Sequence, residues 1–154
     1  MTLVRRLTPE DAPACDGIIA ALPYFFSDPS GVVNASRDLR EHEGWVSEDD
    51  DRVSGFLCLD WPGSQTAEIA WMAVDPEYRR GGRGGQLVEQ ATGHARDAGA
   101  RVLMLYTLPI DDSGETDDGF EGTRVFFRAM GFVDVCVVKP EGWSRAHLQM
   151  VRLL

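Results

Sequence analysis

The residues best suited to chemistry in this chain are a run of glycines and arginines at positions 79–85, Arg-Arg-Gly-Gly-Arg-Gly-Gly. Glycine lacks a Cβ, so several glycines together let backbone N–H groups converge on an anion. An apolar pattern at helical spacing follows, and a helix start offers unpaired N–H groups to the same anion. The arginines add positive charge. The run therefore predicts a phosphate-binding loop, with a solvated basic loop as the alternative.

The segments around the run show how it would be held. Residues 69–74 have the length and composition of a strand, and Asp75-Pro76 ends it because proline cannot donate to a ladder. Gln86 and Leu87 stand where a Walker loop needs lysine followed by serine or threonine. A dinucleotide-binding loop would follow its strand directly, whereas here residues 76–79 intervene. Neither the Walker loop nor the dinucleotide-binding loop therefore explains the order of strand, glycine-rich turn and helix.

Arg79, Gly82 and Gly84, behind Val74-Asp75-Pro76, match the pattern Gln/Arg-x-x-Gly-x-Gly/Ala. The stretch resembles the acetyl-CoA pyrophosphate loop of GNAT-family N-acetyltransferases. The resemblance implies acetyl-CoA as cofactor, with the backbone near residues 73–74 placing an N–H close to the thioester carbonyl. The cofactor-binding residues that it implies are Met72, Ala73, Val74, Arg79, Arg80, Gly81, Gly82, Arg83, Gly84, Gly85, Phe126 and Phe127.

Length and composition indicate one ordinary globular domain over residues 1–154. The net charge of −10 argues against nucleic acid and anionic membranes as general partners. Cys15, Cys58 and Cys136 are an odd, scattered set, so neither a disulfide framework nor a metal site is expected. We expect Cys58 and Cys136 to be core residues, and we expect a cytoplasmic protein, since no segment has the length of a signal or membrane span.

The patterns along the chain predict an α/β fold with a mixed sheet flanked by helices. Helices are expected from Thr8 to Leu22, then over 34–43, 84–98 and 120–130, and strands over 2–7, 44–47, 53–60, 66–74, 101–107, 132–138 and 146–153. The near-continuous apolar run at 101–107 is typical of parallel pairing. The acidic residues 48–51 are expected to form a solvated hairpin tip. The order β-α-α-β-β-β-α-β-α-β-β is also that of the single-domain GNAT fold, so the resemblance covers the whole chain.

A general base is suggested by Glu68. It lies on the strand before the loop, where histone-type members of the resembled family carry a catalytic glutamate. A regular strand would place Glu68 and Val74 on one face, although a bulge would alter this. Its apolar neighbours would raise its pKa towards that of a useful base. The alternative is an inert glutamate at the exposed start of the strand, with ordered water taking the proton.

A general acid is less evident. Residues 123–132 resemble the family segment that ends in Tyr-x-x-x-Gly-Phe, but Phe127 stands at the tyrosine position and Phe126 is no donor either. A phenyl ring can pack against the cofactor but cannot protonate the departing thiolate. Tyr106 is the nearest substitute in sequence, and we expect it to be buried in the core.

The acceptor is defined only as an amine, on a small molecule or a peptide. Acidic residues crowd positions 111–121 and would favour a cationic amine, although a solvated loop is the alternative. Tyr24, Phe25 and Phe26 could line a pocket, although packing over the core is expected of them. Homodimerisation is left open. Rival functions are transfer of a longer acyl chain, a catalytically silent acyl-CoA-binding or regulatory module, and an assembly scaffold.

Overall fold

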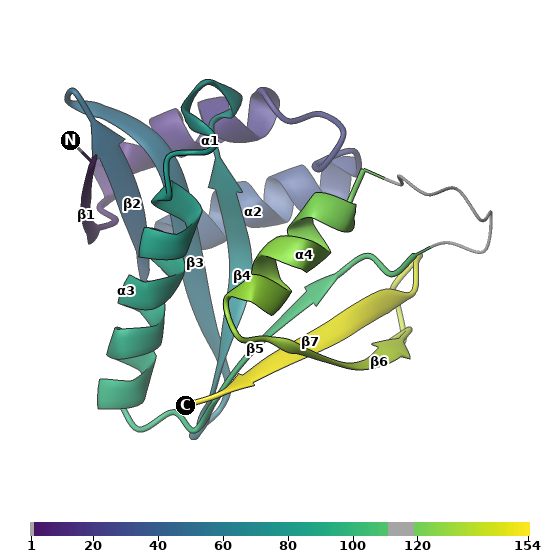
Figure 1. Ribbon diagram of the computed structural model, residues 1–154. Coiled ribbons are helices and arrows are strands. Elements are labelled where there is room, and N and C mark those ends of the chain that lie inside the picture. Colours follow the sequence, from purple (N-terminus) through teal and green to yellow (C-terminus); the bar gives the residue numbers. More distant parts are fainter. Residues whose placement is uncertain (1, 111–118) are drawn as a thin grey trace.

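The computed structural model describes residues 2–110 and 119–154 of the chain. Its strands form one mixed sheet in the order β1-β2-β3-β4-β5-β7-β6 (Figure 1). The strands are β1 (Thr2–Arg6), β2 (Gly44–Asp49), β3 (Arg52–Gly63), β4 (Thr66–Val74), β5 (Val102–Thr107), β6 (Val133–Val138) and β7 (His147–Leu153). The helices are α1 (Ala12–Ala20), α2 (Pro29–Glu41), α3 (Arg83–Asp97) and α4 (Glu121–Ala129), with short 3-10 turns at Pro9–Asp11 and Pro76–Tyr78. The predicted element order is confirmed.

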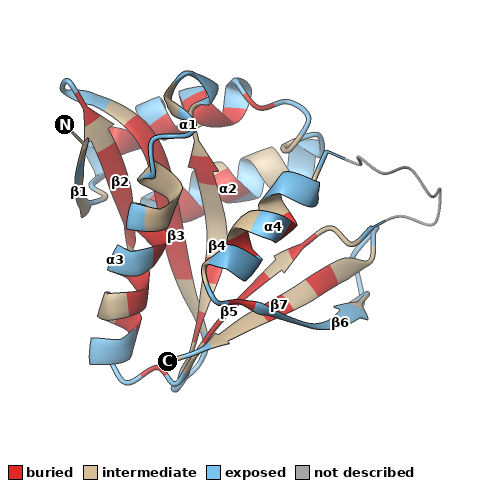
Figure 2. Ribbon diagram, viewed as in Figure 1, coloured by how far each residue is buried: buried red, intermediate tan, exposed pale blue. Residues whose placement is uncertain are grey.

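Two apolar layers cover the two faces of the sheet. Apolar side chains of α3 and α4, among them Leu87 and Phe127, pack on one face. Those of α1 and α2, such as Ile18 and Leu39, pack on the other. Figure 2 shows buried residues concentrated where these helices meet the strands. The sheet therefore has two distinct faces, which we call the α3/α4 face and the α1/α2 face.

Local signals account for most of the boundaries. Gly99 and Gly131 follow α3 and α4 with φ of 97° and 91°, left-handed values that glycine adopts freely, as expected for helix ends. Helix α2 begins five residues earlier than predicted, at Pro29, because the Asp28 carboxylate accepts a hydrogen bond from the Ser30 N–H at 2.9 Å. Proline at the first helical position completes this start.

The hairpin between β2 and β3 corrects one prediction. Asp50 and Asp51 both have positive φ, as a two-residue hairpin turn requires, so they alone form the tip. Asp49 belongs to β2 and is only 5% exposed. It was expected in a solvated acidic tip, but the alternation of strand side chains turns it inward.

The third cysteine is also not where the sequence suggested. Cys58 is buried in the sheet as expected, whereas Cys136 is exposed. It lies on β6, which is the last strand of the sheet and is mostly exposed. An apolar run is therefore a poor guide to burial at the edge of a sheet.

Strands β4 and β5 separate partway along their length. They pair in parallel, as predicted, and the pairs are Thr66 with Val102, Ala67 with Leu103, and Glu68 with Met104. Among the described residues the two strands have no pair beyond Glu68, although β4 continues to Val74. The backbone of the second half of β4 therefore borders a gap in the sheet.

A bulge in β4 changes which side chains share a face. Cys58 of β3 pairs with Trp71 and Leu59 pairs with Ile69, so Ala70 is the extra residue. Ile69 and Val74 pack with the α3/α4 layer, while Trp71 and Ala73 pack with the α1/α2 layer. Glu68 alternates with Ile69 and therefore points to the α1/α2 face. The expectation for a regular strand, that Glu68 and Val74 share a face, is wrong because of this bulge.

None of the helices in residues 2–110 and 119–154 combines the length and apolar character needed to cross a bilayer.

Candidate active site

A cavity of about 810 Å³ opens at the gap between β4 and β5. Its walls come from the segment after α1, the second half of β4, the loop into α3, the end of β5, and α4 with the residues before it. Of the predicted site residues, those lining it are Met72, Ala73, Val74, Arg79, Arg80, Gly82, Arg83, Gly84, Gly85, Phe126 and Phe127. Gly81 and Glu68 are not among the lining residues.

The glycine-rich loop leads directly into the first turn of α3. Gly82 precedes the helix with φ of 77°, a left-handed conformation, and its carbonyl accepts the first helical bond, from the Gln86 N–H at 3.0 Å. The N–H groups of residues 83–85 precede that bond and so lack helical acceptors. Gly84 lies where a Cβ would be 3.2 Å from both Met72 Cε and Phe126 Cζ. The loop therefore presents backbone donors at the narrow end of the cavity.

The three arginines of the loop differ in their surroundings. Arg83 is paired with Asp49: its Nε and Nη2 donate to the two carboxylate oxygens at 2.7 and 2.8 Å. Arg79 lies over the Phe25 ring, 5.5 Å from its centroid. Arg80 takes a positive φ of 67°, which is uncommon outside glycine. Within residues 2–110 and 119–154 neither Arg79 nor Arg80 has an ion-pair partner, whereas the Arg83 guanidinium is paired with Asp49.

The contacts of Arg83 hold the loop against the hairpin. Its Nη1 donates to the Tyr78 carbonyl at 2.8 Å, in the turn that precedes the loop. A Cβ at Gly81 would overlap this Nη1, which explains the glycine there although Gly81 does not line the cavity. Asp49 also accepts from the hydroxyls of Ser54 and Thr2. These hydrogen bonds, that of Arg83 foremost, lower the pKa of Asp49 far below its ordinary value.

Sequence reasoning missed Asp49 as a support of the site. Thirty-four residues separate it from Arg83, and it sits in a run of acids that is typical of a solvated turn. The alternation of β2 was the only available signal, because it places Asp49 on the same face as the buried Ser47.

Glu68 lies beside the gap rather than on the cavity wall. It is the last residue of β4 that pairs with β5, and its neighbour on β3 is Asp60. Burial, with a smaller contribution from the Asp60 carboxylate, raises the pKa of Glu68 above its ordinary value. Tyr106 does line the cavity. Burial is the main cause that raises the pKa of its phenol, and the Glu68 carboxylate adds a smaller contribution. Glu68 pairs with Met104, two residues before Tyr106 on the same strand, so the two side chains lie on the same part of the sheet.

The phenyl rings of α4 leave the cavity without a hydroxyl at the expected position. Phe127 is 7% exposed and packs edge-on against Phe126 and Phe132, with centroids 5.0 and 5.4 Å away. Tyr106 was expected in the core, but it is half-buried, lines the cavity and packs edge-on against Trp143. Among the described lining residues, Tyr106 is the phenol beside the gap, whereas Tyr78 lies next to the glycine-rich loop.

We predict a modest effect of removing the Tyr106 hydroxyl. A general acid typically contributes 10²–10⁴-fold, but a thiol of pKa ~8.5 needs less help to leave. Tyr106→Phe should therefore lower kcat about tenfold at neutral pH without changing the Kd for CoA. Steady-state kinetics and calorimetry measure the two quantities. Phe127→Tyr, which adds a phenol on the opposite wall, should leave kcat equal or raise it. A loss of CoA affinity in Tyr106→Phe would assign the residue to binding instead.

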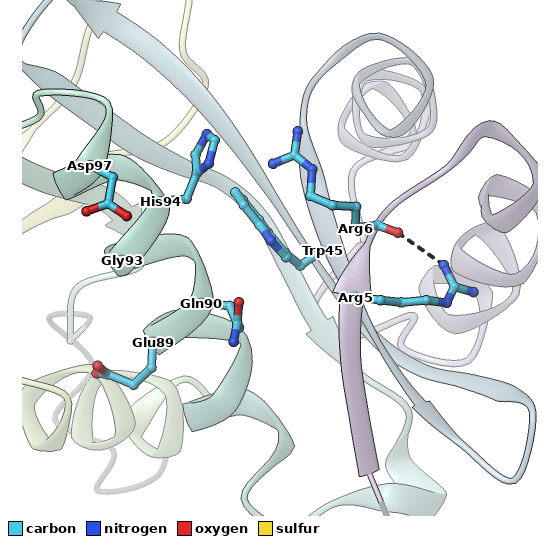
Figure 3. Close-up of a pocket in the computed structure, with 8 residues that line it drawn as sticks. All are labelled: Arg5, Arg6, Trp45, Glu89, Gln90, Gly93, His94 and Asp97. Atoms are coloured by element: carbon cyan, nitrogen blue, oxygen red, sulfur yellow. Dashed lines mark hydrogen bonds between the residues drawn. The ribbon is translucent and has the colours of Figure 1, made fainter.

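A second, shallower cavity of about 510 Å³ lies between β1, β2 and α3 (Figure 3). Its lining residues are Arg5, Arg6, Trp45, Glu89, Gln90, Gly93, His94 and Asp97. Glu43 accepts from Trp61 at 2.8 Å, lies 3.0 Å from His94 Nε2 and is 3.5 Å from Arg6. Arg5 is paired with Asp11 and Glu48. These side chains join strands to helix and are already paired, so the first cavity is the better candidate for a site.

The acidic segment expected near an acceptor lies mostly outside the described residues, which resume at Gly119. Of that group only Glu121 is described, and it is exposed on the first turn of α4. Within residues 2–110 and 119–154, no group of three or more histidine, cysteine or acidic side chains is placed to hold a metal ion.

Comparison with known proteins shows to which family a chain with this geometry belongs. The model of the acetyltransferase (GNAT) family matches residues 15–132, which is more than half of the chain. The chain belongs to the GNAT family. The match includes the glycine-rich loop, the gap between β4 and β5, and helix α4, so the GNAT resemblance seen in the sequence is confirmed.

Among curated GNAT relatives, an amino-acid acetyltransferase of Pseudomonas putida is 46% identical over 110 residues, which is 68% of this chain. The chain spans only 24% of the length of that relative. The PaiA N-acetyltransferase of Thermoplasma acidophilum, solved with coenzyme A, superposes with a TM-score of 0.74 at 15% identity, covering 100% of this chain and 99% of its own. N-acetylglutamate synthase of Neisseria gonorrhoeae, solved with coenzyme A and N-acetyl-glutamate, gives 0.70 at 20% identity, covering 100% and 35%. At these identities the two structures support the GNAT fold.

Proposed function

We propose that this GNAT protein transfers the acetyl group of acetyl-CoA to an amine. The observation that carries the proposal is the cavity that joins the start of α3 to the gap between β4 and β5. Unpaired N–H groups at the helix start, with Arg79 and Arg80, suit a pyrophosphate. The free backbone edge of residues 72–74 suits the amide groups of the pantetheine arm. A thioester held in this way would lie at the gap.

The chemistry asked of the protein is limited. The thioester carbonyl must be polarised, the amine must lose a proton, and the two must be held together. The bulge at Ala70 and the unpaired edge of β4 supply backbone donors beside the gap. Glu68, with its raised pKa, is the candidate base. Nitrogen attacks the carbonyl carbon, the C–S bond breaks, and CoA leaves as thiolate or thiol.

The test of the proposal is release of CoA thiol from acetyl-CoA in the presence of a panel of amines. We expect release that depends on both the amine and the protein, and calorimetry should show CoA binding at one site. An absence of thiol release together with an absence of CoA binding would overturn the proposal.

The conformation of Gly82 provides a sharper test. A Cβ at Gly82 or at Gly93, further along α3, meets nothing within 4 Å, so neither substitution creates a clash. Only Gly82 has positive φ, which costs an L-residue roughly 1–2 kcal/mol. Gly82→Ala should therefore weaken CoA binding about tenfold, measured as Kd by calorimetry, because the loop must shift to relieve the strain. Gly93→Ala should leave Kd unchanged. Equal affinities in the two variants would show that the loop conformation does not determine binding.

A second function, a catalytically silent acyl-CoA-binding module, is favoured by one observation. Phe127 occupies the position of the family tyrosine and is packed into the core. CoA binding without thiol release for any amine would support this function instead. Restoration of release by Phe127→Tyr would then identify the missing phenol as the cause.

A further inference from the structure

The cavity has two ends, and they lie on opposite faces of the sheet. Met72, Val74 and Phe126 pack with the α3/α4 layer, on the side where the glycine-rich loop enters α3. Trp71 and Phe26 pack with the α1/α2 layer and also line the cavity. The cavity therefore passes through the gap between β4 and β5. If the cofactor enters from the α3/α4 face, the acceptor must reach the thioester from the α1/α2 face.

The wall at the α1/α2 end is apolar. It is formed by Leu22, Phe25, Phe26, Trp71 and Tyr106, which we call the apolar wall. The rings of Phe26 and Trp71 are 6.1 Å apart and inclined by 31°. The Trp71 ring is fixed by α2, since its Nε1 donates to the buried Asp38 carboxylate at 2.8 Å. Phe25 and Phe26 are only partly buried, so the wall retains apolar area for a ligand.

Among the described residues, the apolar wall has no cation left for a carboxylate once the proposed pyrophosphate is bound. The cations among the described lining residues are Arg79, Arg80 and Arg83, all in the glycine-rich loop. Arg83 is paired with Asp49, and Arg79, which lies over Phe25 where the loop meets the wall, is assigned together with Arg80 to the pyrophosphate. Residues 111–118, Asp-Asp-Ser-Gly-Glu-Thr-Asp-Asp, contain no basic side chain. A carboxylate facing the wall would be desolvated without compensation, which is costly.

We infer that the acceptor is a primary amine carried on a neutral, apolar group, aromatic or branched, with no carboxylate beside the nitrogen. This inference rests on the proposed acetyl transfer and names its substrate class. The ammonium would approach the gap near Glu68, which pairs with Met104, two residues before the wall residue Tyr106 on β5. The apolar group would pack on Phe26 and Trp71. This class differs from the amino acid named for the Pseudomonas putida relative and from the N-acetyl-glutamate named for the Neisseria structure.

Three amines test the inference because they differ by one feature each. 2-Phenylethylamine carries the apolar ring alone, L-phenylalanine adds a carboxylate, and putrescine replaces the ring with a second ammonium. With acetyl-CoA, we expect kcat/KM for 2-phenylethylamine to exceed that for each of the others by at least about tenfold, the scale on which a pocket rejects an unpaired charged group. Faster turnover of L-phenylalanine or L-glutamate would overturn the inference, as would faster turnover of putrescine. Each of these results would leave acetyl transfer intact.

Phe26→Ala examines the wall itself. It should lower kcat/KM for 2-phenylethylamine about tenfold while changing that for ethylamine little, because ethylamine is too short to reach the ring. The ratio of the two values is informative even if the variant is less stable. Val33→Ala, at an exposed position of α2, is the matched control and should leave the ratio unchanged.

The wall could instead hold a long acyl chain, and a donor series separates the two occupants. If octanoyl-CoA is used faster than acetyl-CoA, and Phe26→Ala removes only that preference, the wall serves the donor and the inference is wrong. If acetyl-CoA is preferred and selectivity among amines depends on Phe26, the inference stands. Failure of every donor and amine, without CoA binding, would overturn the proposed function as well.

Discussion

Glu68→Gln is expected to lower kcat about 10²–10⁴-fold at neutral pH, the usual cost of losing a general base, while the Kd for CoA stays nearly constant. The reason is positional. The bulge at Ala70 turns Glu68 to the α1/α2 face, the side from which we propose that the acceptor approaches, and away from the α3/α4 face. Burial raises the pKa of its carboxyl, which makes it a better proton acceptor.

The role of Glu68 as a base also predicts how kcat/KM changes with pH. In the parent protein kcat/KM should fall as pH decreases through the raised pKa of Glu68, because the protonated carboxyl cannot accept a proton. The glutamine variant should lose this acid limb, and its deficit should shrink at high pH, where free amine is abundant. Asp60→Asn should shift the limb to lower pH, since the Asp60 carboxylate helps to raise the pKa of Glu68.

Stability separates this effect from damage to the fold. Because the folded pKa of Glu68 is raised, its charged form disfavours folding at neutral pH, so Glu68→Gln should not lower Tm. Glu121→Gln, an exposed site on α4, is the matched control for loss of one acid. If the Glu68→Gln variant keeps the pH–rate profile of the parent, Glu68 is not the base.

Asp49→Asn is expected to weaken both the fold and cofactor binding. The substitution leaves the half-buried Arg83 without its bidentate partner, and removing one member of a partly buried, hydrogen-bonded ion pair is destabilising because the other charge loses its compensation. We expect Tm to fall by about 5 °C or more. CoA affinity should fall about tenfold, because Arg83 also fixes the Tyr78 carbonyl and the start of α3. Thermal unfolding and calorimetry provide the measurements.

The control for Asp49 stands two residues away. Asp51→Asn also removes one acid from the hairpin, but at an exposed position in the turn, and should change neither Tm nor Kd.

The stabilising effect of Asp49 should also depend on pH. The pKa of Asp49 is lowered in the folded protein, so its contribution to the free energy of unfolding is fully present at neutral pH and is lost as pH falls below about 4. The difference in Tm between parent and Asp49→Asn should therefore narrow in acid. The double variant Asp49→Asn/Arg83→Ala should lose no more unfolding free energy than the sum of the losses in the two single variants, because both changes remove the same ion pair.

Much of the architecture could be predicted because its signals are local. The strand over 66–74 matches its predicted bounds, and Gly99 and Gly131 end their helices for a reason contained in one residue. The cofactor loop is likewise a local motif, since Asp75-Pro76 and the following glycines specify the turn and the helix start. The predicted residues of the loop, apart from Gly81, line the cavity for this reason, whereas Phe126 and Phe127 reach it through the packing of α4.

What the sequence by itself determined is therefore the order of elements, the GNAT family and the glycine-rich loop that leads into α3. Tertiary structure alone decided the partner of Arg83, the face to which Glu68 points and the exposure of Cys136 and Tyr106. Each of these depends on how separate elements meet: Asp49 of β2 reaches Arg83 of α3 across 34 residues, and the bulge at Ala70 exists only in the register between β3 and β4. Side-chain periodicity within one strand cannot report an irregularity that its neighbour imposes.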